Sequence, residues 1–192
     1  LLIIISSVLL LGCSTGSKSL NRGDYDLAVY QAVKRLQQSP NHQKASEVLK
    51  KAYSMAVERH LENVRVYDLS QNNNKWEMMA QEYGNIEYLN NLIRSYPEYK
   101  SLVNLVDVTE QLANTRHQAS KEFISRGNMF MAQGTKESAR SAYLEFDMAE
   151  QYDPGNDSII ELILNAREAG TLNVAIQFPN DLHRLYYLPS DD

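Results

Sequence analysis

The sequence has very little cysteine, because Cys13 is the only cysteine in 192 residues. One thiol cannot form a disulfide within the chain, and it cannot build a zinc site that needs several converging ligands. His42, His60, His117 and His183 are scattered, with no His-x-x-x-His spacing. We therefore predict no metal site and interpret the four histidines as surface residues.

Basic stretches and catalytic motifs are also lacking. The net charge is −5, with acidic and basic residues interspersed, so no basic stripe is present to neutralise nucleic-acid phosphates. The chain contains neither a Gly-x-Ser-x-Gly nucleophile motif nor a glycine-rich phosphate loop. Glu137-Ser138 matches the Glu-Ser pair of lytic transglycosylases, but an acidic residue at a helix start is explained by the helix dipole. We predict no enzymatic activity, no catalytic residue and no nucleic-acid partner.

Glycine and proline are few, with eight and five residues at isolated positions. This distribution is typical of helices separated by turns. Apolar residues recur at three- and four-residue steps through most of the chain, which predicts an all-α fold. We expect helices over residues 24–39, 43–67, 76–95, 109–132, 136–152 and 157–168. We expect residues 96–108 to form an extended or partly helical connector.

The spacing of apolar residues changes after Gly170. Leu172, Val174, Ile176 and Phe178 alternate with Asn173, Ala175 and Gln177, which is a strand pattern. A second strand is expected in residues 183–188, and an isolated hairpin is only marginally stable in water. We therefore interpret residues 171–192 as the beginning of a β module that this chain does not complete.

The chain opens on an uncharged apolar run that ends at the single cysteine. Residues 1–12 are shorter than the ~20 residues needed to span a bilayer and fit the apolar region of a signal peptide. The sequence Leu10-Leu11-Gly12-Cys13 resembles the lipobox of bacterial lipoproteins, in which a leucine and a small residue admit the signal peptidase. The resemblance implies cleavage before Cys13 and a diacylglycerol on its sulfur. A plain secretory signal or a truncated membrane helix is the alternative.

The lipobox resemblance also implies a location. Ser14 after the cysteine favours sorting to the outer membrane, with the protein facing the periplasm of the cell envelope. We expect residues 1–12 to be a signal peptide truncated at its N-terminus, and residues 13–22 to be a lipidated cysteine with a flexible leash. The lipid is the only bound group that we predict. Such a leash reaches about 30 Å.

Two stretches resemble the tetratricopeptide repeat, abbreviated TPR. In this 34-residue motif, glycine permits the turn, alanine allows close helix contact, an aromatic fills space and proline ends the second helix. The first stretch carries Gly23, Tyr25, Ala28 and Pro40, and the second carries Gly127, Phe130, Gly134, Ala139, Tyr143 and, three residues late, Pro154. Arg35, Lys50 and Phe146 occupy positions where the family has small residues.

This resemblance implies antiparallel helical hairpins, an α-solenoid, over residues 23–169. A plain helical bundle is the alternative. In the repeat the first helix precedes the turn glycine, here Gly23. This helix would therefore fall on residues 9–22, which we interpret as signal peptide, lipobox and leash. We therefore expect the fold to begin on a second helix with an uncovered outer face.

The TPR resemblance also implies a concave groove lined by the first helix of each repeat. The corresponding positions are Lys44, Glu47, Lys51, Ser54 and Met55, and then Lys121, Ile124, Asn128, Met131 and Ala132. We expect envelope proteins to place a peptide or helix there. The predicted function is a scaffold that serves an outer-membrane assembly or secretion machine. The alternative is a helical spacer for an enzymatic or carbohydrate- or peptidoglycan-binding module beyond Asp192.

Overall fold

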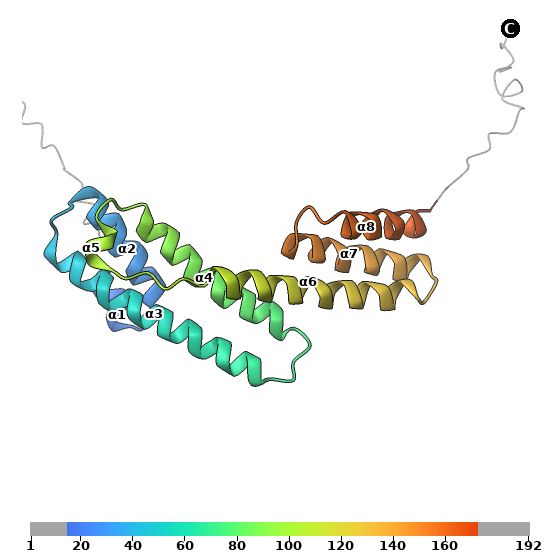
Figure 1. Cartoon of the computed structure of the whole chain (residues 1–192), viewed down its shortest axis with the longest axis horizontal. Helices are drawn as coiled ribbons and strands as arrows, with labels where there is room; N and C mark the ends of the chain where they lie inside the picture. Colours follow the sequence, from blue (N-terminus) through green and yellow to red (C-terminus); the bar gives the residue numbers. More distant parts are fainter. Residues whose placement is uncertain (1–14, 173–192) are drawn as a thin grey trace, which may run out of the picture.

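A computed structural model describes residues 15–172, and the regular secondary structure of this part of the chain is all α-helix, without a strand. Figure 1 shows an elongated molecule in which α6 leads from a group of helices around α2–α5 to α7 and α8. The helices are α1 (Ser17–Asn21), α2 (Tyr25–Gln38), α3 (Gln43–Leu69), α4 (Lys75–Arg94), α5 (Tyr99–Leu102), α6 (Thr109–Met131), α7 (Lys136–Tyr152) and α8 (Asp157–Gly170). The all-α prediction is confirmed for these residues.

The predicted helices and connector match the structure to within a few residues. Residues 96–108 contain the short helix α5, and Val103 after it is extended, as predicted. The signal peptide at residues 1–12, the lipidated Cys13 and nearly all of the expected β segment at 171–192 lie outside the described residues. No helix in the described range is long and apolar enough to cross a membrane.

Local capping explains several helix starts. The Thr135 and Ser138 side chains cap α7 reciprocally, with Ser138 N donating to Thr135 Oγ1 at 3.0 Å and Thr135 N donating to Ser138 Oγ at 3.2 Å. Glu137 is an exposed acidic residue in the first turn of this helix, where the helix dipole favours it. Asn156 Oδ1 accepts from Ser158 N at 3.1 Å at the start of α8. These bonds satisfy amide groups that helix starts leave unpaired.

The helices pack mainly against their neighbours in the chain. α2 contacts α3, α3 contacts α4, α4 contacts α6, α6 contacts α7 and α7 contacts α8. The largest core lies among α2, α3 and α4, and two smaller clusters lie among α6, α7 and α8. Alanines that are fully or nearly fully buried line these contacts and let helices approach closely; they are Ala28, Ala32, Ala45, Ala52, Ala56, Ala139, Ala142, Ala149 and Ala166.

Gly127 explains why the large Phe146 is accommodated at a position where the TPR pattern has a small residue. Gly127 is buried in α6, and a Cβ atom added to it would lie 2.3 Å from Cε1 of Phe146. Phe146 is fully buried. The small residue is therefore on α6 and the large one on α7, so the two helices still pack closely.

Gly23 and Gly134 occupy turns before α2 and α7 with φ of 83° and 70°, a conformation that glycine adopts without steric cost. Pro40 follows the end of α2, and Pro154 follows the end of α7. Partly buried aromatic side chains from the same pattern pack on the cores; they are Tyr25, Phe130 and Tyr143.

The prediction of a flexible leash is wrong for residues 17–21, because they form α1 and pack against α2. Ser19 is buried and its Oγ donates to Gln31 Oε1 at 3.0 Å. A Cβ on Gly16 would meet the carbonyl oxygen of Ala28 at 2.5 Å, so glycine permits this close contact. The fold therefore does not begin on α2, and α1 covers part of its outer face.

Candidate functional site

The candidate site is a groove of about 620 Å³ between α4 and α6. It lies where these two helices pack together, at the junction between the two groups of helices (Figure 1). Tyr88 stands on its wall with 59% of its surface exposed. The lining residues are Glu77, Ala80, Gln81, Gly84, Glu87, Tyr88, Asn91, Leu112, Arg116 and Tyr152.

Arg116 fixes the end of the groove formed by α6 and α7. Its Nε donates to the carbonyl of Tyr152 at 3.2 Å and its Nη2 to the carbonyl of Gln151 at 2.8 Å. These are terminal carbonyls of α7, where a cation is favoured by the helix dipole. The Tyr152 ring stacks on Phe123 at a centroid distance of 5.4 Å, and burial raises the pKa of the Tyr152 hydroxyl.

The two carboxylates that line the groove differ in their partners. Glu87 Oε1 pairs with Arg94 Nη1 at 2.9 Å, and Glu87 Oε2 accepts from Asn90 Nδ2 at 3.2 Å. Glu77 forms no hydrogen bond or ion pair with the other described residues. Glu77 is therefore the carboxylate in the groove that can accept a cation from a bound molecule.

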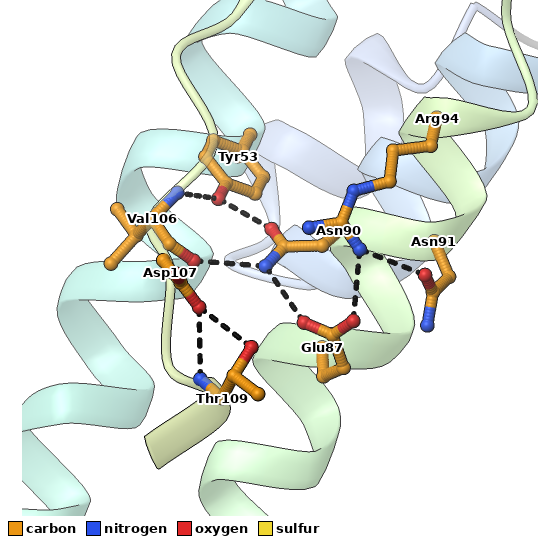
Figure 2. Close-up of polar contacts among 8 residues, drawn as sticks. All are labelled: Tyr53, Glu87, Asn90, Asn91, Arg94, Val106, Asp107 and Thr109. Carbon is orange, nitrogen blue, oxygen red and sulfur yellow. Dashed lines mark hydrogen bonds and ion pairs between the residues drawn. The ribbon is translucent and has the colours of Figure 1, made fainter. Parts of the chain in front are cut away.

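Figure 2 shows the buried polar network that determines where α6 begins. Asn90, fully buried on α4, accepts from Tyr53 OH at 2.7 Å and donates to the carbonyl of Val106 at 2.9 Å. The Tyr53 hydroxyl accepts in turn from Val106 N at 2.8 Å. Because an unpaired buried polar group is costly, this network holds the connector against α3 and α4.

Asp107 continues the same connection into α6 (Figure 2). Its Oδ1 accepts from Thr109 N at 3.0 Å and from Thr109 Oγ1 at 2.7 Å, at the first residue of α6. These hydrogen bonds lower the pKa of Asp107. The network therefore positions the start of α6 relative to α4, and this placement shapes the groove.

The groove residues predicted on α3 are on its surface, but only Ser54 and Met55 line a hollow, and these are two separate hollows. Lys44, Glu47, Lys51 and Ser54 are exposed, and Met55 is half-buried. Ser54 lines a hollow of about 330 Å³ with Leu102 and Val103. Met55 lines another of about 420 Å³ with Tyr25 and Arg59, whose guanidinium lies 5.0 Å from the Tyr25 ring centre.

The residues predicted on α6 fall into two groups. Lys121, Asn128 and Ala132 are exposed. Ile124 and Met131 are half-buried and pack against the core of Ala142, Phe146 and Ala166. None of these five residues lines the α4–α6 groove, so the structure does not bring the two predicted sets together there.

The interpretation of His60 as a surface residue is wrong. This side chain is 4% exposed and joins three helices. Nδ1 contacts Glu82 Oε2 of α4 at 2.5 Å, and Nε2 contacts Asp26 Oδ1 of α2 at 3.1 Å. Burial alone would lower the pKa of His60, but the two carboxylates raise it above its ordinary value. The imidazole bridges carboxylates of α2 and α4 inside the helical packing.

The other three histidines that we predicted on the surface differ in their exposure and contacts. His42 is half-buried and caps α3 by accepting from Ala45 N at 3.3 Å. His117 is exposed, with Nδ1 3.8 Å from Asp153 Oδ2. His183 lies outside the described residues. Among residues 15–172, no group of three or more His, Cys, Asp or Glu side chains could hold a metal ion.

Sequence reasoning missed both the α4–α6 groove and the network behind it. The one available signal was Asn90, a polar residue within the apolar pattern of Ile86, Leu89 and Ile93. Such a residue indicates a buried hydrogen-bonding partner. Tyr88 and Arg116 gave no such signal, because their proximity depends on how α4 meets α6.

Comparisons with protein-family models, curated proteins and solved structures found no match for this chain.

Proposed function

We propose that this protein is a lipid-anchored binding scaffold of the bacterial envelope, with TPR-like helical hairpins and its partner site in the α4–α6 groove. The observation that carries the proposal is the open groove itself. Helices that pack mainly on their chain neighbours leave extended surfaces between elements, and repeat proteins bind partners on such surfaces. Gly127 and the turn residues Gly23 and Gly134 support the hairpin geometry.

The lining of the groove indicates the chemistry of the partner segment. Tyr88, Leu112 and Ala80 offer apolar contact, and Glu77 offers an unpaired carboxylate. Exposed aromatic residues are common at protein interfaces because one ring buries a large area at low entropic cost. The groove fits a peptide or helix with an apolar side chain next to a lysine or arginine. Complementary charge gives such an interaction specificity.

The proposed anchor lies close to the folded body. Because α1 begins at Ser17, only a few residues separate Cys13 from the packed structure. At ~3.4 Å per residue, this link spans about 10–15 Å, which is less than half of the reach expected for the flexible leash. In the proposed arrangement the scaffold works at the periplasmic face of the outer membrane, as an accessory of an assembly or secretion machine.

Substitution of Cys13 by alanine tests the anchor. We expect the Cys13→Ala chain to lose labelling by a lipid precursor and to leave the membrane fraction, because Cys13 is the only thiol in the sequence. Continued membrane association would contradict the anchor.

Affinity purification from envelope extracts tests the scaffold. We expect Tyr88→Ala to reduce co-purified protein at least about tenfold, since an aromatic hot spot contributes about 2 kcal/mol or more and every 1.4 kcal/mol is about tenfold in affinity. Val66→Ala is the matched control, because Val66 is similarly exposed on α3 and lies outside the groove. Equal recovery with both variants would contradict the assignment of the groove.

A further inference from the structure

A second surface, separate from the α4–α6 groove, lies between α7 and α8 at the end of the described chain. It contains a hollow of about 340 Å³ lined by Tyr143, Leu144 and Ala166, with Arg140 and Arg167 among the remaining lining residues. The lining is mainly apolar, although it faces solvent. No described helix follows α8 to cover it.

Exposed aliphatic side chains mark α7 and α8. Leu144 is 64% exposed, Leu164 57% and Ile160 40%. Ile160 and Leu164 are four residues apart on α8, so they lie on one side of that helix. The opposite side of α8 packs against α6 and α7, because Ile159 and Ala166 are fully buried in the cores shared with those helices.

The chain leaves α8 directly at this hollow. Arg140 Nε donates to the carbonyl of Gly170 at 3.0 Å, and Lys136 Nζ donates to the carbonyl of Thr171 at 3.0 Å. Thr171 itself lines the hollow. These two α7 side chains hold the exit point, so the next residues of the chain start beside the apolar surface at high effective concentration.

The sequence that follows has the pattern needed to cover such a surface. Leu172, Val174, Ile176 and Phe178 alternate with more polar residues. An extended stretch of six residues spans about 20 Å, and the ten residue steps from Ile160 to Gly170 span about 15 Å of helix. A segment that turns back at Thr171 is therefore long enough to run along α8 as far as Ile160.

We propose that residues 173–178 of this chain pack along the α7–α8 hollow and the neighbouring exposed side of α8, with Val174, Ile176 and Phe178 directed toward Leu144, which lines the hollow, and toward Leu164 and Ile160 on α8. A strand that is marginal alone gains a partner by packing its apolar face on helices. Arg140 and Arg167 line the hollow, and residues 179–192, which follow the docked segment, carry Asp181, Asp191 and Asp192 against the single Arg184, so the charge of the following stretch also favours a place beside these arginines.

This docking goes beyond the proposed function and does not depend on it. It attaches the C-terminal segment to the helical body as a packed unit and fixes how any following module is oriented. The anchor and the partner groove could both be correct while the docking is wrong. The test therefore uses readouts that neither of them affects.

The first test is disulfide trapping in the full chain carrying Cys13→Ser, which removes the only native thiol. We expect Leu164→Cys to form an intramolecular disulfide with Ile176→Cys at least about tenfold faster than with Ala175→Cys, because alternate residues face opposite sides. Equal rates for the two pairs would overturn the proposal. Trapping mainly between chains would also overturn it and would assign the groove to a second copy.

The second test is amide hydrogen exchange in the same full chain. Leu164→Asp removes apolar contact from an exposed position, so the helices stay folded, and exchange in residues 173–178 rises about tenfold. Val66→Asp, at a similarly exposed site on α3, leaves that exchange unchanged. Unprotected amides in residues 173–178 of the unsubstituted chain would overturn the proposal.

Discussion

At the residue scale, Gly127 shows how one missing side chain sets the spacing of two helices. We predict that Gly127→Ala destabilises the protein by about 1–3 kcal/mol, because the added methyl group would overlap the Phe146 ring and cores resist overpacking. Urea unfolding measures the effect. Gly84→Ala is the control: nothing lies within 4 Å of its added Cβ, and helix propensity favours alanine by up to about 1 kcal/mol. Equal behaviour of the two variants would contradict the close contact.

His60 gives a second prediction at the residue scale, because its charge depends on pH. The pKa of His60 is raised in the folded protein, so its stabilising effect is complete below the ordinary value of about 6.5 and is lost as pH rises through the folded value. The pKa of Asp26 is lowered, chiefly by its hydrogen bond to His60. The stabilising contribution of Asp26 is therefore lost as pH falls through the lowered pKa of Asp26.

We therefore expect the free energy of unfolding to decrease between pH 6 and pH 9. His60→Gln flattens this dependence and costs about 1.5–3 kcal/mol near pH 6, the range for hydrogen bonds to charged groups. His117→Gln, at an exposed site, is the control and keeps the decrease that depends on His60, because His60 and its two carboxylate partners are unchanged. A profile of the same slope with and without His60 would show that the bridge is uncharged.

At the scale of elements, the connector at residues 103–108 positions α6 through Asn90. We predict that Asn90→Leu costs about 1–3 kcal/mol, because it leaves the buried Tyr53 hydroxyl without its acceptor. Hydrogen exchange rises at Val106 and in the first turn of α6. Asn91→Leu, one residue away and exposed, stays within about 0.5 kcal/mol. Unchanged exchange at Val106 would contradict the positioning role of the network.

The sequence predicted the longer elements because their apolar periodicity spans many residues, as in α3. It did not predict α1, which has five residues and is too short to be stable without packing. It also placed His60 on the surface, since Asp26 and Glu82 lie 34 and 22 residues away. The α4–α6 groove was missed for the same reason: it depends on contacts between distant segments.

At the scale of the whole molecule, the helices pack in chain order and form an elongated body (Figure 1). The proposed lipid attaches near α1, the proposed partner groove lies at the middle junction, and the α7–α8 surface lies at the far end. In this order the proposed partner groove lies between the proposed membrane attachment and the C-terminal end of the described residues.

Site-specific photo-cross-linking in cells tests the central claim most directly. A photoreactive phenylalanine analogue replaces Tyr88 in the full-length chain, and the same analogue replaces Val66 in the control. We predict a discrete cross-linked envelope protein from position 88 that is absent from position 66 and is reduced by Glu77→Gln. No adduct at position 88, or the same adducts at both positions, would contradict a scaffold that binds its partner in the α4–α6 groove.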